Sequence, residues 1–316
     1  MEHTDTRWDV VVIGGGMAGL SAAIWARRLG LSVVVLERAQ RPGGQLLELT
    51  APIIDYPGVP RTPGPALAEI VYRQALDLGA RILTETPVQR IDPLQRICHT
   101  PRGPFAGRAV ILATGVRPRR LGVPGEADLY AAGLVQRPSQ NLSWFRHRRV
   151  AVVGGGDRAV ENALLLAPVA SEVVLIHRRS RLRARETLVR QLRKESGIRL
   201  LLETQVTAFS IRRNAEGLPA GANLHLIRPD GEAGLLADAV CIYIGNEPVI
   251  DLLKGLAAET PEGGLQTDSY GRTSLPGIWA VGDVHLPPAH QSLATCAGQA
   301  MVAVKEIALE LQSCPP

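Results

Sequence analysis

The chain has 316 residues, 46% of them hydrophobic and 21% charged, with a formal net charge of +5. This size and composition are typical of a globular enzyme of two domains, and no apolar run approaches the ~18 residues of a membrane span. The positive charge is almost all arginine, and without a recognition motif or a basic–aromatic stripe it does not predict nucleic-acid binding.

The first motif is a strand, a glycine turn and a helix close to the N-terminus. The polar start MEHTDTR is not typical of a signal peptide, so we expect a cytoplasmic protein. The apolar run Val10–Ile13 predicts a parallel strand buried on both faces, and residues 14–19 (GGGMAG) then give G-x-G-x-x-G. A helix ending at Gly30 leads to a second strand that ends in Glu37, whose carboxylate suits ribose hydroxyls. This order predicts a dinucleotide site for FAD or NAD.

The same pattern recurs in the middle of the chain. The strand RRVAVVGGG leads into residues 154–159 (GGGDRA), in which Ala159 replaces the third glycine. The following strand ends in residues 177–179 (HRR) instead of an acid, and Arg183 lies four residues further on. Arginines favour a 2′-phosphate through charge-assisted hydrogen bonds, so this site predicts NADPH. The alternative, that the arginines between residues 178 and 193 form only a solvated face, stays open, although the strand-end position of Arg178 and Arg179 favours a binding role.

The C-terminal part contains a short apolar strand that ends in Gly282 and Asp283. A carboxylate there, beside the start of the last helix, suits the ribityl hydroxyls of a flavin and indicates that the chain returns to the first domain. We therefore predict an α/β fold with two Rossmann-like domains of the three-layer ββα type, the second inserted in the first. The expected domains are 1–117 with 246–316 for FAD and 118–245 for NADPH.

These motifs together resemble the low-molecular-weight thioredoxin reductase-like flavoproteins over nearly the full length. The resemblance is carried by GGQL and DYPG in the flavin loop, ATG and GVPGE at the domain junction, GGGDRA and HRRSRLRA at the second site, and the final GD with Gln291. It implies FAD and NADPH as cofactors, a redox-protein partner and a homodimer. The residues expected to bind FAD are Gly14, Gly16, Met17, Ala18, Gly19, Glu37, Arg38, Gly44, Gln45, Leu46, Asp55, Val88, Ala113, Thr114, Gly115, Gly282, Asp283, His290, Gln291 and Ser292. Those expected to bind NADPH are Gly154, Gly156, Asp157, Arg158, Ala159, His177, Arg178, Arg179, Arg183 and Gly245.

The sequence departs from the family where the redox-active C-A-T-C motif belongs. Arg137, Pro138, Ser139 and Gln140 fall on those positions, and Asn141 falls on the acid that follows. The four cysteines, at positions 98, 241, 296 and 314, include no C-x-x-C pair, and their spacing predicts no metal site. Serine cannot undergo thiol–disulfide exchange, so no thioredoxin reduction through a dithiol is expected.

Further residues differ from the family or lie near the lost motif, and some of them leave alternatives open. Arg158 replaces a serine at the expected pyrophosphate, where it either pairs with the phosphate or fills its place. Asp55 replaces an asparagine and His290 an arginine near the expected flavin. Trp144 and Phe145, near the lost motif, either cover the flavin or pack a loop.

The predicted function is NADPH-dependent flavin oxidoreduction, with electrons passing to a carrier such as ferredoxin or flavodoxin. This is similar to the thioredoxin-reductase-like ferredoxin/flavodoxin–NADP reductases, which also lack C-x-x-C. The alternatives are a flavoprotein that takes electrons from a protein donor without using NADPH, an NADPH oxidase with no dedicated partner, a non-catalytic flavin-binding module, and thiol chemistry at one of the four cysteines.

Overall fold

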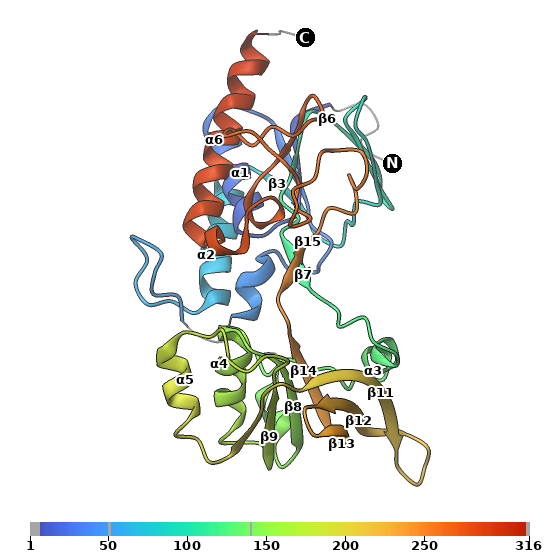
Figure 1. The fold of residues 1–316 in the computed structure, drawn as a ribbon. Helices are drawn as coiled ribbons and strands as arrows, with labels where there is room; N and C mark the ends of the chain where they lie inside the picture. Colours follow the sequence, from blue (N-terminus) through green and yellow to red (C-terminus); the bar gives the residue numbers. More distant parts are fainter. Residues whose placement is uncertain (1–6, 50–51, 140, 314–316) are drawn as a thin grey trace. The chain divides into compact units, whose positions relative to one another are not determined.

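The structure, a computed structural model, describes residues 7–49, 52–139 and 141–313. The chain divides into two compact units: Met1–Arg117 with Glu247–Pro316, and Pro118–Asn246. We call them unit 1 and unit 2. The chain passes between them in β7 (Val116–Pro118) and β15 (Asn246–Pro248), which pair with each other (Figure 1). No helix in the described ranges is both long enough and apolar enough to span a bilayer.

Unit 1 is built on a largely parallel sheet in the order β3-β2-β1-β6, with β16 also pairing parallel to β6. β5 and β4 extend it as an antiparallel edge beyond β6. Its strands are β1 (Trp8–Ile13), β2 (Val33–Leu36), β3 (Arg81–Leu83), β4 (Arg90–Asp92), β5 (Ile97–Thr100), β6 (Gly103–Leu112) and β16 (Ile278–Ala280). Its helices are α1 (Met17–Arg28), α2 (Gly64–Asp77) and α6 (Leu293–Ser313), with short 3-10 turns η1 (Gly44–Glu48), η3 (Gly282–Val284) and η4 (Pro288–His290).

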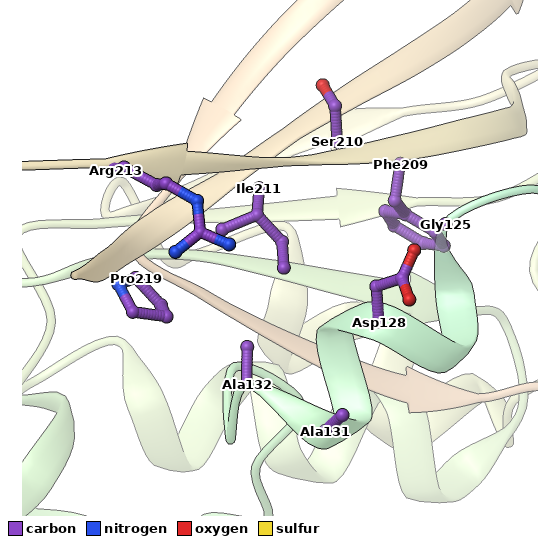
Figure 2. A pocket seen from close by; sticks show the side chains of 9 residues that line it. All are labelled: Gly125, Asp128, Ala131, Ala132, Phe209, Ser210, Ile211, Arg213 and Pro219. Carbon is purple, nitrogen blue, oxygen red and sulfur yellow. The ribbon is translucent and has the colours of Figure 1, made fainter. Parts of the chain in front are cut away.

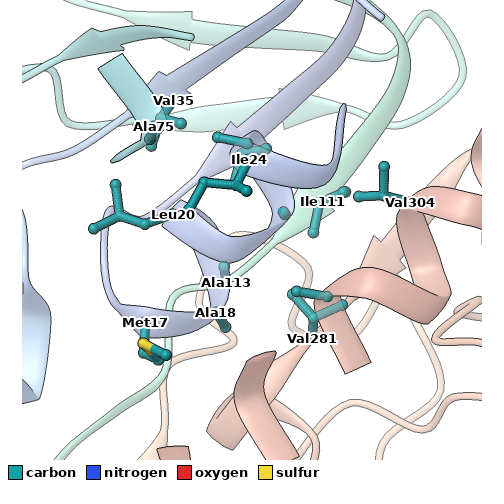
Figure 3. Close-up of a cluster of buried hydrophobic side chains, with 14 of the residues drawn as sticks. Met17, Ala18, Leu20, Ile24, Val35, Ala75, Ile111, Ala113, Val281 and Val304 are labelled. Carbon is teal, nitrogen blue, oxygen red and sulfur yellow. The ribbon is translucent and has the colours of Figure 1, made fainter. Parts of the chain in front are cut away.

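The sheet of unit 1 is apolar on both faces, which is why its strands read as continuous hydrophobic runs instead of alternating ones. On one face, Val10, Val12 and Ile111 pack against α1, α2 and α6 (Figure 3). On the other face, Val11 and Val110 pack against the segment that precedes β16. Because both faces are covered, only the strand ends are left to present polar groups.

Unit 2 repeats the parallel arrangement in the order β10-β9-β8-β14. A three-stranded antiparallel sheet, β11-β12-β13, covers one face of it, and α4 with α5 covers the other. Its strands are β8 (Arg149–Gly154), β9 (Glu172–Ile176), β10 (Ile198–Leu201), β11 (Gln205–Arg213), β12 (Pro219–Arg228), β13 (Gly231–Ala237) and β14 (Ala239–Tyr243). Its helices are α3 (Glu126–Ala131), α4 (Asp157–Leu166) and α5 (Glu186–Leu192), with the 3-10 turn η2 (Leu142–Phe145).

The stretch before β8 belongs to the core of unit 2. Phe145 is 1% exposed and packs against Val150, Val173 and Ala239 in one apolar cluster. Trp144 packs edge-on against Phe145, with the ring centroids 5.1 Å apart, and Arg148 lies 4.1 Å above the Trp144 ring. The packing interpretation of Phe145 is therefore the one that the structure supports.

Truncating Phe145 should destabilise unit 2. Phe145→Ala removes a ring from a closed cluster, and such a change costs about 3–5 kcal/mol. Hydrogen exchange of the β8 and β9 amides reports this unit alone, and those amides should lose protection by that amount. Leu218→Ala, at a side chain 61% exposed, is the control and should leave protection unchanged. A loss below about 1 kcal/mol in Phe145→Ala would contradict the assigned packing.

Candidate functional site

The glycine turn after β1 has the close contacts that its pattern predicts. Gly14 has a φ of +105°, and a Cβ there would lie 2.5 Å from the Ala113 carbonyl oxygen. A Cβ on Gly19 would lie 1.9 Å from the Gly14 carbonyl oxygen, so α1 packs directly on the turn. At Gly16, by contrast, the nearest atom would be the Cα of Gly44 at 3.9 Å. The turn is therefore tight at Gly14 and Gly19 but open over the start of α1, which is the room that a pyrophosphate needs.

Glu37, directly after β2, braces this turn. Its Oε2 accepts the Gly15 N–H at 2.6 Å and its Oε1 accepts the Ala39 N–H at 2.7 Å, with the side chain 8% exposed. Sequence reasoning predicted that this carboxylate would accept from ribose hydroxyls. A carboxylate has about four acceptor sites, so the two backbone bonds leave capacity for that role.

Several predicted FAD residues lie together because parallel strands bring their carboxyl ends to one edge of the sheet. Ala113–Gly115 follow β6, and Gly282 with Asp283 follows β16. Gln45, in η1, donates from Nε2 to Asp283 Oδ2 at 2.8 Å across 238 residues of sequence. The predicted residues Met17 and Ala18 form the first turn of α1. This group spans the first and last parts of the chain.

The other predicted FAD residues have fewer contacts with the residues around Asp283. Gln291 donates to the carbonyls of Leu286 and Asp283, at 3.1 and 3.5 Å, and Ser292 Oγ accepts the Thr295 N–H at the start of α6. Among the described residues, no hydrogen bond or ion pair joins the side chains of Arg38, Asp55 or His290 to Asp283, and Val88 packs against the core on the second face of the sheet.

The turn after β8 repeats that geometry in unit 2. Gly154 has a φ of +152°, and a Cβ there would lie 2.2 Å from the Tyr243 carbonyl oxygen. A Cβ on Gly156 would meet no atom within 4 Å. Ala159 is fully buried at the third position of the pattern, and Gly245, with a φ of +102°, follows β14. The second turn is thus also tight at its base and open at the start of α4.

Backbone hydrogen bonds around the two turns correspond one to one. In unit 1 the bonds run from Gly43 N to Gly15 O (2.8 Å), Glu37 N to Leu83 O (2.8 Å), Thr86 N to Glu37 O (2.8 Å) and Glu85 N to Ala39 O (3.0 Å). In unit 2 the corresponding bonds, in the same order, run from Arg183 N to Gly155 O (2.7 Å), His177 N to Leu201 O (2.8 Å), Thr204 N to His177 O (3.0 Å) and Glu203 N to Arg179 O (3.1 Å). Even the left-handed backbone recurs, with φ of +50° at Glu85 and +49° at Glu203. The two units therefore share one arrangement of a glycine turn and four backbone hydrogen bonds, which we call the turn frame. In this frame His177 of unit 2 occupies the position of Glu37 in unit 1.

Sequence reasoning missed part of this frame, although a signal for it exists. Thr86 and Thr204 are buried, each Oγ1 hydrogen-bonded to a carbonyl two residues earlier. They lie in LTETPV and LLETQV, which share the pattern L-x-E-T-x-V after the third strand of each unit. The repeat of this pattern was the available signal.

His177 differs from Glu37 in its hydrogen bonds. Its Nε2 lies 3.0 Å from the Arg181 carbonyl oxygen, and its ring covers Gly155 so closely that a Cβ there would meet Nδ1 at 2.2 Å. Burial lowers the pKa of His177, and Arg183, Arg179 and Arg178 lower it further against the hydrogen bond to Arg181. The imidazole is therefore neutral at pH 7, with Nε2 as the donor.

The arginines of the loop after β9 fall into two groups. Arg185 pairs with Asp157 at 2.7 Å and Glu161 at 3.1 Å, and so fastens the loop to the start of α4. Arg178, Arg179 and Arg183 are exposed, and in the described part of the chain none of them forms an ion pair. No carboxylate among the described residues pairs with these three guanidinium groups, whereas the Asp157 carboxylate binds Arg185.

Arg137, Pro138, Ser139 and Gln140 are the residues that the sequence comparison with the family predicts at the C-A-T-C positions. Pro138 is buried, Arg137 and Ser139 are partly buried, and Gln140 lies outside the described residues. Asn141 accepts the Trp144 N–H at 3.2 Å and so caps η2. Cys98, Cys241 and Cys296 are buried, and burial raises the pKa of Cys98 and Cys296 to about 12 and that of Cys241 further. None of these three thiols is a thiolate at neutral pH.

A hollow of about 560 Å³ lies in unit 2 between α3 and β11 (Figure 2). Asp128 lies on the helix side of the hollow, and Ile211 and Arg213 extend toward it from the strand side. None of the residues predicted to bind a cofactor lines it.

The chain is similar in sequence to a known family over most of its length. Residues 8–306 match the family model described as pyridine nucleotide-disulphide oxidoreductase. A thioredoxin reductase from Treponema pallidum (strain Nichols) is 34% identical over 303 residues, covering 95% of this chain and 96% of the relative. A thioredoxin reductase from Listeria monocytogenes is 32% identical over 286 residues, which cover 90% of this chain and 88% of that protein.

Solved structures extend the similarity to the fold. A crystal structure of Lactococcus lactis thioredoxin reductase in its FR conformation matches with a TM-score of 0.85 and 30% identity, over 96% of this chain and 100% of that one. The T. acidophilum thioredoxin reductase matches with a TM-score of 0.82 and 27% identity, over 96% and 98%. The predicted α/β fold class with two Rossmann-like units is confirmed.

The lowered pKa of His177 predicts a pH dependence of stability. Below its ordinary value of 6.5, the unfolded chain binds a proton that the folded chain does not take up. Unit 2 should therefore have its full stability above pH 6.5 and lose part of it as the pH falls below that value. An NMR titration of the His177 imidazole C–H signals checks this. A His177 midpoint at or above 6.5 would contradict the assigned environment.

Proposed function

The chain belongs to the pyridine nucleotide-disulphide oxidoreductase family, whose thioredoxin reductase members use FAD and NADPH, and is an oxidoreductase of that family. From this premise we propose that it carries electrons from NADPH through FAD to a separate redox protein, without a dithiol of its own. The single observation behind the proposal is that one turn frame occurs twice, with a carboxylate in unit 1 and a neutral imidazole beside three arginines in unit 2.

Unit 1 fits FAD. Gly14, Gly16 and Gly19 would take the pyrophosphate over the start of α1, Glu37 would face the ribose, and Asp283 would accept from the ribityl hydroxyls. The open space at Gly16 is the fit that supports this, because any side chain there would enter the space meant for the pyrophosphate. Met17, Ala18 and Gln45 would lie beside the same molecule, because they belong to the group of residues around Gly16 and Asp283.

Unit 2 fits NADPH. Gly154 and Gly156 would receive the pyrophosphate, and Arg178, Arg179 and Arg183 would bind the 2′-phosphate, supported by the absence of carboxylate partners for these arginines in the described chain. Asp157 would act indirectly, since it holds Arg185 and thereby the end of the arginine loop. Bound together, the two cofactors supply hydride transfer from nicotinamide to flavin and onward release of electrons.

The proposed acceptor is an acidic one-electron carrier protein of the ferredoxin or flavodoxin kind. The thioredoxin reductase relatives point to a redox protein as partner. The chain has no C-x-x-C, and its described thiols are buried and protonated, so transfer by thiol–disulfide exchange is not supported. A net charge of +5 favours an acidic partner by electrostatic complementarity. A homodimer remains part of the proposal.

A second candidate is a flavoprotein that takes its electrons from a protein donor. Arg158 favours it, because this long exposed side chain stands at the start of α4 where unit 1 has Ala18. Arg158→Ala separates the two: it should weaken NADPH binding if Arg158 pairs with the pyrophosphate and strengthen it if Arg158 occupies the pyrophosphate position.

Turnover with alternative acceptors tests the proposed function. With NADPH in excess, the holoprotein should reduce an acidic ferredoxin or flavodoxin and should give no thioredoxin reduction above a blank without enzyme. Raising the ionic strength should slow the reaction with the acidic carrier, because surface charges are screened. Thioredoxin reduction at a rate comparable with that of a dithiol-containing relative would overturn the proposal.

Substitution of His177, whose ring covers the second glycine turn, tests the NADPH site. His177→Glu restores the arrangement of unit 1, in which the carboxylate accepts the N–H groups of the turn and the loop, and it adds a charge that repels a 2′-phosphate. The ratio of kcat/KM for NADPH to that for NADH should fall by roughly tenfold or more.

Arg190→Ala is the matched control for His177→Glu, because Arg190 is exposed and lies beyond the loop on α5. It should leave the ratio within about twofold of the unmodified protein. An unchanged ratio in His177→Glu would show that this position does not govern the choice of dinucleotide.

A further inference from the structure

The turn that carries Asp283 is held by a side chain from the last helix. Gln299, on α6, accepts the Gly282 N–H at Oε1 over 3.0 Å, and the same oxygen lies 3.0 Å from His285 Nε2. Thr267 Oγ1 lies 3.0 Å from the other ring nitrogen, His285 Nδ1. Three side chains from separate segments therefore form one chain of hydrogen bonds that ends on the backbone of the turn.

The direction of each hydrogen bond follows from one fixed donor. A backbone N–H can only donate, so the Gln299 atom facing Gly282 is its oxygen, and His285 must carry its proton on Nε2. Nδ1 is then an acceptor, and the Thr267 hydroxyl donates to it. Burial lowers the pKa of His285, against the opposing effects of the Gln299 hydrogen bond and the Asp283 charge, so this neutral form is the one present at pH 7.

The turn at Gly282 is confined by close contacts with the neighbouring helices. Gly282 has a φ of +77°, and a Cβ there would lie 2.8 Å from Ala18 Cβ and 3.3 Å from Cys296 Sγ. It is therefore pressed between α1 and α6, and any shift of the turn would close one of these gaps. The hydrogen bond from the Gly282 N–H to the Gln299 oxygen determines the position of the turn along α6.

The carboxylate of Asp283 is fixed by this placement. Its Oδ2 accepts from Gln45 Nε2 at 2.8 Å, and Cys296 Sγ lies 3.6 Å from Oδ1. Both contacts come from other elements, η1 and α6, so they persist only while the turn keeps its position. The direction of the carboxylate thus depends on the hydrogen bond at Gly282, one residue earlier.

We propose that Gln299, oriented by His285 and Thr267, is a positioning residue that aims Asp283 at the flavin. The inference rests on the proposed role of Asp283 as a flavin-binding residue. Neither Gln299 nor His285 needs to touch the cofactor. Their effect is on the affinity for FAD and on the environment of the bound flavin.

Two substitutions at Gln299 separate positioning from simple packing. Gln299→Leu removes the acceptor, and the reconstituted protein should bind FAD at least tenfold more weakly, with a shifted visible flavin spectrum. Gln299→Glu keeps an oxygen that accepts from both Gly282 and His285, and it should restore affinity to within about threefold. Gln312→Leu, at an exposed glutamine of the same helix, is the control and should behave as the unmodified protein.

The outcomes are distinguishable from failure of the proposed function. If the unmodified protein takes up no FAD, the proposed function fails. If it binds FAD and Gln299→Leu binds it equally with an unchanged spectrum, or if Gln299→Glu is as impaired as Gln299→Leu, the positioning role is overturned. Should Gln299→Leu fail to fold, Thr267→Val removes only the donor to His285 Nδ1, and its FAD affinity and spectrum decide by the same criteria.

Discussion

The rest of the site depends on the close approach between the middle of each glycine turn and the residue that follows the second strand. In unit 1 that residue is Glu37, which accepts the Gly15 N–H at 2.6 Å, and in unit 2 it is His177, whose ring covers Gly155. No side chain fits at Gly155 without displacing this ring, because a Cβ would lie 2.2 Å from Nδ1. This contact fixes where the loop after the second strand runs, and therefore where its side chains lie relative to the glycine turn.

The two loops share their backbone hydrogen bonds but carry different side chains, and under the proposed function this difference would let one arrangement serve two cofactors. The loop of unit 1 carries a carboxylate whose charge lies at the turn, and Gly43 supplies the N–H that closes the loop on Gly15. In unit 2 an arginine, Arg183, supplies the equivalent N–H to Gly155, and the carboxylate is replaced by a neutral ring. The backbone hydrogen bonds of the two loops are the same, so under the proposed function the choice of cofactor would follow from the side chains that the loops carry and not from a different fold.

Local patterns in the sequence predicted this frame well, and long-range contacts less well. The two glycine turns and the strand-end residues Glu37, His177 and Asp283 could be placed because each lies within a short, periodic pattern. The bond from Gln45 to Asp283, and the role of Gln299, join residues far apart in the chain, and no spacing rule signals such pairs. The sequence favoured packing for Phe145 over covering a cofactor, but it could not show which residues Phe145 packs against, because those residues lie on separate strands.

The most direct test of this account is anaerobic rapid mixing of the FAD-loaded protein with NADPH or NADH, followed by the flavin absorbance at ~450 nm. The arginines beside the second glycine turn are proposed to bind the 2′-phosphate, which NADH lacks. The account therefore predicts fast bleaching with NADPH and much slower bleaching with NADH at the same concentration. Equal rates with the two nucleotides would contradict the role assigned to the arginines of unit 2. No bleaching with either one, while dithionite still reduces the flavin, would contradict the assignment of unit 2 as a working nucleotide site.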